Sequence, residues 1–367
     1  MLNRPKILIA PLDWGIGHAT RVIPIIKFLI HLNLEVIIAV DEPIRSLLQQ
    51  EFPKNLFILL KGYNITYSKQ KKWLSVKIIS QIPKILISIY QEHKWIKKVA
   101  KTYNIDGIIS DNRFGLFHRN LPCAYITHQL VIKTGNKYAE NTLQTIHNWF
   151  IKRYTYCWIP DYPSSPNIAG KLSHPDKNIP LNVKYIGALS RFNKLPGEKF
   201  KYDILILISG PEPQRSIFEN LILSQLQEFA GEVLIVRGLP QVKNATILEN
   251  GKKNIHIKNH LSANDLNLAI NNSQIIICRS GYTSIMDLIK LQKKAILVST
   301  PGQTEQEYLA QHLMQQKIFY SVDQNNFLLP QVLEQAKNFD FSVVDFDMEL
   351  FKKPVLSFVK SLDKKVV

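Results

Sequence analysis

KILIAPLDWGIGHATR, residues 6–21, joins an apolar run to a turn that contains two glycines, a histidine and an arginine. The apolar part is typical of a strand that is buried on both faces of a parallel sheet. The following residues, ATRVIPIIKFLIHLN, are apolar at helical spacing, and Pro24 is expected to kink that helix or to set its first turn. A strand, a glycine turn and a helix in this order predict the start of an α/β domain.

The same alternation continues along the chain and then starts again. Short apolar runs predict further strands at 34–40, 55–60, 105–111, 123–128, 202–209, 232–238, 274–280 and 294–300, with an amphipathic helix at 213–229. Two such series predict an α/β protein with two doubly wound, Rossmann-like domains.

The polar stretch SRFNKLPGEKF, residues 190–200, is a suitable linker between the two domains because it contains both proline and glycine. We therefore expect an N-terminal domain over 1–195 and a second domain over 196–340. The remaining residues, 341–367, are expected to form a helical segment that packs back on the first domain.

Composition limits the class of protein. The chain has 367 residues and a formal net charge of +17, which favours anionic partners, although a general bias toward Lys, Ile and Asn explains the charge equally well. Cys123, Cys157 and Cys278 are too far apart for a metal motif or a disulfide framework. The first apolar run is too short for a signal peptide, and no apolar stretch is long enough to span a bilayer. These features favour a cytoplasmic protein.

Gly15 and Gly17 follow the first strand and would let a ligand approach the backbone closely. A dinucleotide fingerprint needs a third glycine, but that position is Thr20, so NAD binding is only weakly indicated. The turn is therefore predicted to be a ligand-binding loop of another kind, with Arg21 at its end.

His18 is the candidate general base, because it follows the turn at the carboxyl edge of the predicted sheet. Asp111 ends another strand of the same domain and can orient His18 and stabilise its charged form. Asp13 is a competing base, ranked lower because a carboxylate needs a raised pKa for that role. Alternatively, His18 caps its own helix and Asp111 caps a turn.

In the second half, polar residues follow three predicted strands. Two of these turns lead into helices and suit a diphosphate, and the polar side chains of the third suit sugar hydroxyls. Each turn taken alone could also be an ordinary helix cap. The candidate residues are Ser209, Gly210 and Arg215 after the first strand, Arg279, Ser280, Gly281, Thr283, Ser284 and Asp287 after the second, and Gln303, Glu305 and Gln306 after the third.

On these residues the chain resembles the GT-B glycosyltransferases, especially the MurG type, which transfers N-acetylglucosamine from a UDP-sugar. GIGHATR is similar to the glycine-rich loop of that group, and CRSGYTSIMDL to its donor signature. The resemblance implies that Asp287 holds the ribose, that Arg279, Thr283 and Ser284 contact phosphate, and that Glu305 and Gln306 touch the donor sugar. Asp287 replaces the usual glutamate, and the loop at 208–215 lacks the usual Gly-Gly-Ser run.

The resemblance also implies a metal-independent and inverting transfer of a hexosyl group, with His18 as the base and no cofactor beyond the nucleotide-sugar. The donor would bind the second domain. The acceptor would bind the first domain, beside the loop of Asp13, Gly15, Gly17 and Arg21.

Residues 69–101 contain nine lysines and one acidic residue, with Trp73, Tyr90 and Trp95 interleaved. Ile78, Ile82, Ile85 and Ile89 would share one helical face, although Pro83 can break the helix. Such a segment can lie on an anionic membrane surface, which suits a lipid-linked acceptor reached from the cytoplasmic side. A core-facing helix with a solvated basic side is the alternative, and no motif indicates nucleic-acid binding.

The sequence therefore predicts a glycosyltransferase that uses a nucleotide-sugar, UDP-linked by resemblance, and a lipid-linked or glycan hydroxyl. Two other functions stay open: a nucleotide-sugar epimerase of the same fold, and a non-catalytic module that binds a sugar nucleotide. An NAD oxidoreductase is the weakest alternative, because the turns of the second half match it poorly.

Overall fold

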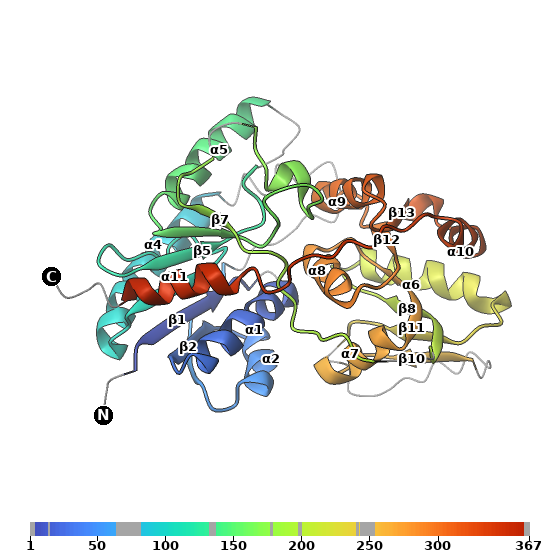
Figure 1. Ribbon diagram of the computed structural model, residues 1–367, viewed down its shortest axis with the longest axis horizontal. Coiled ribbons are helices and arrows are strands. Elements are labelled where there is room, and N and C mark those ends of the chain that lie inside the picture. Colours follow the sequence, from blue (N-terminus) through green and yellow to red (C-terminus); the bar gives the residue numbers. More distant parts are fainter. Residues whose placement is uncertain are drawn as a thin grey trace. The chain divides into compact units, whose positions relative to one another are not determined.

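The computed structural model describes residues 4–13, 15–63, 82–131, 137–176, 179–196, 200–239, 242 and 254–362. The chain forms two compact units (Figure 1). The N-terminal unit comprises Met1–Arg191 and Asp347–Val367, and the C-terminal unit comprises Phe192–Phe346. The chain thus leaves the N-terminal unit once and returns to it for its last residues.

The N-terminal unit is built on a seven-stranded sheet in which all neighbouring strands are parallel. The strands, in spatial order, are β3 (Leu56–Leu59), β2 (Glu35–Val40), β1 (Lys6–Pro11), β4 (Gly107–Asp111), β5 (Cys123–Ile126), β6 (Tyr156–Ile159) and β7 (Val183–Tyr185). The chain moves outward from β1 to β3 and then crosses back to β4. The direction of winding therefore reverses between β1 and β4, and this is where doubly wound sheets bind ligands.

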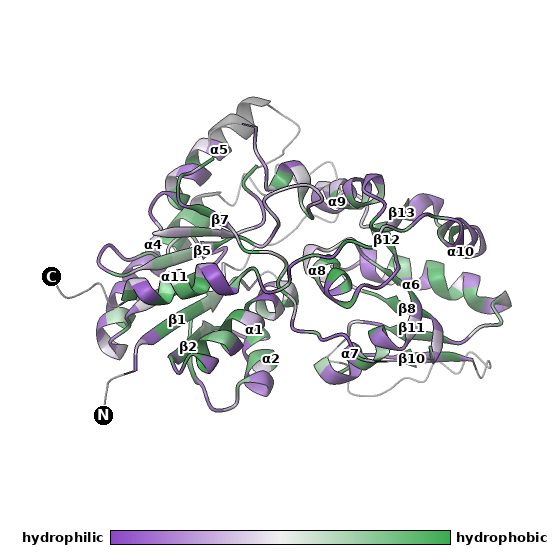
Figure 2. Ribbon diagram, in the orientation of Figure 1, coloured by the Kyte–Doolittle hydropathy of each residue, from purple (hydrophilic) through white to green (hydrophobic). Residues whose placement is uncertain are grey.

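Helices cover both faces of this sheet, as the apolar strands require (Figures 1 and 2). α4 (Ile82–Tyr103) and α5 (Lys137–Ile151) lie on one face, where Ile96 and Ile151 join the core. α1 (Ile16–His31), α2 (Ile44–Glu51) and α11 (Lys352–Leu362) lie on the other. The last of these packs closely, since a Cβ on Gly107 would lie 2.8 Å from the ring of Phe358.

The C-terminal unit repeats the scheme with six parallel strands. In spatial order they are β10 (Ile255–Lys258), β9 (Val233–Val236), β8 (Tyr202–Leu207), β11 (Ser273–Cys278), β12 (Ala295–Ser299) and β13 (Tyr320–Asp323). The helices are α6 (Gln214–Gln225), α7 (Ala263–Asn271), α8 (Tyr282–Leu291), α9 (Thr304–Gln315) and α10 (Leu329–Lys337). Here the winding reverses between β8 and β11.

The predicted fold class is confirmed, and the strands expected from the apolar runs are present. β6, β7, β10 and β13 were not predicted. The first helix runs from Ile16 to His31 with Pro24 inside it, so the proline does not set its first turn.

Lys69, Lys71, Lys72, Trp73 and Ile78 of the basic segment lie outside the described residues, and α4 begins at Ile82.

Candidate active site

The carboxyl edge of the N-terminal sheet brings His18 and Asp111 together where the winding reverses. Asp111 is the last residue of β4, and His18 lies in the first turn of α1. Nδ1 of His18 is 3.1 Å from Oδ2 of Asp111. The imidazole is 16% exposed and the carboxylate is fully buried, so only the histidine can meet a ligand from solvent.

A third group, Arg21, lies on the same carboxylate. Its Nε is 2.9 Å and 3.0 Å from the two oxygens of Asp111, and its Nη2 also donates to Oδ1. Its Nη1 lies 3.2 Å from Nδ1 of His128, which follows β5. Arg21 is 2% exposed, so it supports Asp111 from inside the unit.

The charges in this cluster set the protonation states of its members. Burial lowers the pKa of His18, and the Arg21 guanidinium lowers it further, while Asp111 opposes both. Burial works against the ionised form of Asp111, but Arg21 and His18 outweigh it and lower the pKa of that carboxyl. Near neutral pH the cluster therefore holds a neutral imidazole beside a carboxylate, as a general base requires.

Asp13 lies at the same edge, in the turn after β1, and is held by its neighbours. Its Oδ1 lies 3.4 Å from both Nη2 of Arg113 and the backbone nitrogen of Tyr63. A Cβ on Gly62 would stand 1.7 Å from Oδ2 of Asp13, so that position must be glycine for the carboxylate to keep its place. Arg113 is fully buried and also donates to Glu92.

Gly15 begins α1 with a backbone conformation that only glycine adopts readily, with φ at 148° and ψ at 165°. No side chain caps this helix start, and no acidic residue occupies its first turn. Gly15 is exposed and Gly17 is partly exposed, and their role as a binding loop stays a prediction.

In the C-terminal unit, the predicted donor residues lie along the carboxyl edge of three adjacent strands: β8, β11 and β12. Ser209 and Gly210 are exposed after β8. A Cβ on Gly210 would lie 3.9 Å from Oγ1 of Thr300, which follows β12. That hydroxyl is buried and has no hydrogen-bond partner in the described part of the chain. The turns after the two strands therefore lie close together around an unpaired hydroxyl.

Arg279, which was expected to contact phosphate, is buried and bonded to residues of its own unit. The side chain is 1% exposed, and its Nη atoms donate to the backbone oxygens of Ser299 and Gln214 and to Oε1 of Gln324. Its guanidinium carbon lies 4.1 Å from the ring centre of Phe218. Burial lowers the pKa of Arg279 to about 10, which is still charged near neutral pH. Arg279 thus ties β12 to the start of α6.

Arg215, which was expected to contact phosphate, forms ion pairs with two glutamates of its own unit. Its Nε lies 2.6 Å from Glu212, and its Nη1 lies 2.9 Å from Glu219. Glu219 pairs with Arg237 as well. These ion pairs neutralise the guanidinium within its own unit.

The remaining donor candidates form two groups. Ser280 and Gln306 connect the turns, because the serine hydroxyl donates a hydrogen bond to the backbone oxygen of Gln306. The side chain of Gln306 accepts a hydrogen bond from the backbone nitrogen of Thr300 and donates one to Oε1 of Gln303. The second group lies half-exposed at the starts of α8 and α9, and consists of Gly281, Thr283, Ser284, Asp287 and Glu305.

Sequence reasoning missed His128, Arg113 and Thr300. Each of them lies within three residues of the end of a predicted strand, so the rule that found Asp111 could have found them too. Within the described ranges, no three His, Cys, Asp or Glu side chains cluster in a way that could hold a metal ion. None of the helices described there is long and apolar enough to cross a membrane.

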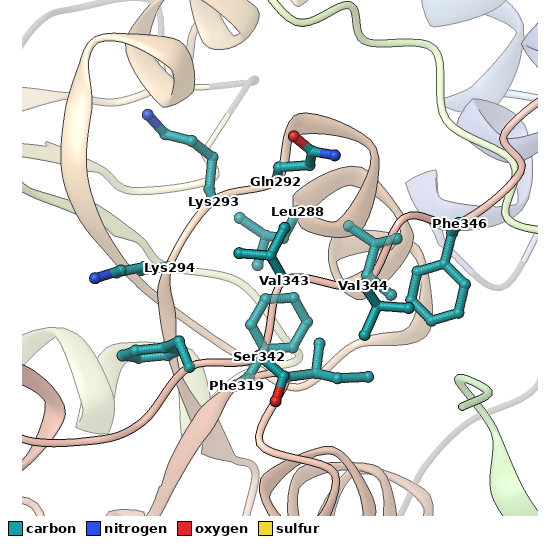
Figure 3. A pocket seen from close by; sticks show the side chains of 12 residues that line it. Leu288, Gln292, Lys293, Lys294, Phe319, Ser342, Val343, Val344 and Phe346 are labelled. Atoms are coloured by element: carbon teal, nitrogen blue, oxygen red, sulfur yellow. The ribbon is translucent and has the colours of Figure 1, made fainter. Parts of the chain in front are cut away.

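A small apolar hollow of about 100 Å³ lies elsewhere in the C-terminal unit, beside the starts of β12 and β13. Figure 3 shows Phe319, Val343 and Val344 gathered there, while Lys293 and Lys294 extend away from them. The hollow lies at the amino ends of these strands, so it is not part of the edge that carries the donor candidates.

Comparisons with known proteins agree with this geometry. Residues 214–342 match the glycosyltransferase family 28 C-terminal domain, and no curated protein matches the chain in a sequence search. The glycotransferase of kitacinnamycin has a TM-score of 0.64 at 11% identity, over 99% of this chain and 97% of that one.

Two further structures are similar over nearly their whole length. The spinosyn rhamnosyltransferase SpnG complexed with thymidine diphosphate has a TM-score of 0.61 at 12% identity, over 98% of this chain and 96% of that one. MurG of Acinetobacter baumannii has a TM-score of 0.53 at 13% identity, over 98% and 95%. The structures share the two-unit fold, and the family match covers most of the C-terminal unit. The chain has the GT-B fold of these glycosyltransferases, and its residues 214–342 match a glycosyltransferase domain.

Proposed function

We propose that this glycosyltransferase moves a hexosyl group from a UDP-sugar to a hydroxyl of a lipid-linked or glycan acceptor, with inversion and without a metal ion. The N-terminal unit would bind the acceptor and the C-terminal unit the donor. The observation that carries the proposal is the buried Asp111 carboxylate, which holds the partly exposed imidazole of His18 at the edge where ligands bind.

His18 has the geometry of a general base. The Asp111 carboxylate accepts a hydrogen bond from Nδ1, so Nδ1 carries the proton and Nε2 keeps its lone pair. Nε2 would take the proton of the acceptor hydroxyl as its oxygen bonds to the anomeric carbon. The bond from that carbon to the diphosphate breaks on the opposite face, and the nucleoside diphosphate leaves with the electron pair. The buried carboxylate then stabilises the imidazolium.

The leaving diphosphate needs donors, and the arginines predicted for this role are turned inward. The start of α8 can supply them instead. Gly281 occupies its N-cap position without a side-chain cap bond, and the hydroxyls of Thr283 and Ser284 follow in the first turn. Ser209 and Gly210 lie after the adjacent strand β8. Asp287, one turn further along α8, would accept hydrogen bonds from the ribose hydroxyls.

Exposed apolar side chains on α4 and α5 support a lipid-linked acceptor. Ile89, expected to meet the membrane, is buried beside Phe150 instead. Other large apolar side chains of these two helices are 44–59% exposed, and Nζ of Lys94 lies 4.6 Å from the ring centre of Tyr90. They are Leu86, Ile87 and Tyr90 on α4, and Ile146 and Trp149 on α5. Such a surface suits peripheral binding at the cytoplasmic face of a membrane.

Transfer assays in a chelator test the proposal. UDP-, dTDP- and GDP-sugars are supplied in turn with a polyprenyl-diphosphate-linked sugar or a free glycan, and the anomeric proton of the product is read by NMR. Metal-free transfer from a UDP-sugar with inversion, lost in His18→Ala, is the expected result. Transfer that survives His18→Ala at the wild-type rate would exclude His18 as the base.

The same assay separates the epimerase alternative. An epimerase changes the UDP-sugar itself and needs no acceptor, so a new nucleotide-sugar would appear in reactions from which the acceptor is omitted. If every reaction contains only the unchanged nucleotide-sugar and no product, the result would favour a non-catalytic module that binds a sugar nucleotide.

A further inference from the structure

A second hollow, of about 400 Å³, lies in the N-terminal unit and is lined by His93, Phe117, Arg119 and Arg153. Arg119 stands four residues before β5 and Arg153 three residues before β6, so both lie toward the end of the sheet where these strands begin. The carboxyl edge with the candidate base is at the opposite end. The hollow is therefore separate from the proposed active site.

The guanidinium of Arg153 lies among aromatic rings. Its guanidinium carbon lies 3.3 Å from the ring centre of Trp149, 4.9 Å from that of Phe117 and 5.5 Å from that of Phe150. In the ranges that the structure describes, the guanidinium makes no hydrogen bond and no ion pair. Contact with the ring faces does not use the N–H donors of the guanidinium, which stay available to an anion.

Arg119 brings a second cation to the same hollow, and no described acid pairs with it. Partial burial lowers the pKa of Arg153, and the charge of Arg119 lowers it further. Two like charges that face one cavity repel each other, and an anion between them offsets that repulsion.

His93 indicates which kind of anion this hollow can bind. Its ring stacks on Phe117 with 4.2 Å between centres, and its Nδ1 is buried without a partner among the described residues. This nitrogen accepts a hydrogen bond when the proton of the neutral ring is on Nε2, and donates one when it carries a proton itself. A phosphate monoester near neutral pH offers both, since its oxygens can carry or accept a proton.

We propose that this hollow binds a phosphate monoester, with Arg119 and Arg153 on the phosphate oxygens and His93 beside them. The ligand could come from two sources. A soluble phosphate or sugar phosphate would fill the hollow alone. A lipid phosphate would also place its chains near Trp149, which is 54% exposed.

The experiment measures thermal shifts with inorganic phosphate and glucose 6-phosphate, and sedimentation with phosphatidylcholine vesicles containing phosphatidic acid. Vesicles with phosphatidylglycerol at the same charge control for nonspecific attraction. The test variant is Arg119→Gln/Arg153→Gln. The matched control is Lys184→Gln, which removes an exposed charge from β7 of the same unit.

Stabilisation by soluble phosphate that weakens at least about tenfold in the double variant, and not in Lys184→Gln, supports a soluble ligand. A preference for phosphatidic acid over phosphatidylglycerol, lost only in the double variant, supports the lipid source. Equal behaviour of the double variant and the Lys184→Gln control in both assays overturns the proposal. Neither readout depends on transfer, so the hollow and the role of His18 can fail separately.

Discussion

The guanidinium of Arg21 lies against the carboxylate of Asp111, and both groups are buried. Asp111 therefore carries two partners, since His18 reaches its other side at 3.1 Å. This arrangement fixes the carboxylate before any ligand arrives and lets it hold one tautomer of the histidine. It also makes the acid part of the folded core, so its replacement acts on both stability and turnover.

Asp111→Asn is expected to lower turnover by about 10²–10⁴-fold, because an amide can stabilise the wrong tautomer of His18 and cannot balance the imidazolium. It should also lower the free energy of unfolding by about 3–5 kcal/mol, since Arg21 loses its buried counter-ion. Steady-state kinetics and urea unfolding measure the two effects.

His18→Ala is the matched variant for this prediction. It should lower turnover by a similar factor while the unfolding midpoint and UDP binding stay close to wild type. A variant at position 111 that loses stability but keeps its rate would show that the acid is only structural.

Arg21→Gln is expected to move the acid limb of the kcat/KM profile to higher pH. The base is active when neutral, so activity rises with pH through the pKa of His18. Arg21 lowers that pKa, and its removal lets the pKa rise. Rate measurements across the pH range, on protein confirmed as folded by circular dichroism, check the shift. If the acid limb of the kcat/KM profile stays at the wild-type pH, the charge of Arg21 does not lower the pKa of His18.

The sequence predicted the pairing of His18 with Asp111 because both residues end or follow strands, and parallel strands bring their carboxyl ends to one edge. It missed β10 and β13, whose sequences IHIK and YSVD mix polar and apolar residues at the margin of the sheet. Composition also could not show where a side chain points. Arg279 has the right charge for phosphate, yet its Nη atoms donate to two backbone oxygens and to Gln324 inside the unit.

Gly62→Ala is expected to destabilise the N-terminal unit, because the new Cβ would overlap the carboxylate of Asp13 at 1.7 Å. Asp13→Ala removes the obstacle, so the double variant should be more stable than Gly62→Ala alone. Gly281→Ala is the comparison, since its Cβ would find no atom nearer than 4.0 Å. Thermal unfolding of the wild type and the four variants checks this, and additive effects of Gly62→Ala and Asp13→Ala would contradict the predicted overlap.

Asp287→Ala is expected to weaken UDP binding about tenfold or more, with little loss of stability, because the side chain is half-exposed on α8. Arg279→Gln should do the reverse and lower the unfolding free energy by about 2–4 kcal/mol, since buried carbonyl oxygens lose their donors. Calorimetric titration with UDP and urea unfolding separate the two. Wild-type affinity in Asp287→Ala would remove this aspartate from the donor site.

His147 predicts how stability depends on pH. The side chain is 5% exposed, and its burial lowers the pKa to about 4, against 6.5 for the free group. Between these values the unfolded chain binds a proton that the folded protein excludes. The neutral, buried His147 therefore makes its full contribution to the free energy of unfolding above about pH 6.5. As the pH falls toward 4, the free energy of unfolding decreases by up to about 3 kcal/mol.

His147→Phe removes this titration and keeps an aromatic ring beside Phe114 and Tyr125. Its unfolding free energy should fall less steeply than that of the wild type between pH 6.5 and 4. His31→Gln, which replaces an exposed histidine at the end of α1, should follow the wild-type curve. Urea unfolding at several pH values compares the slopes, and parallel curves for His147→Phe and wild type would show that folding does not lower the pKa of this histidine.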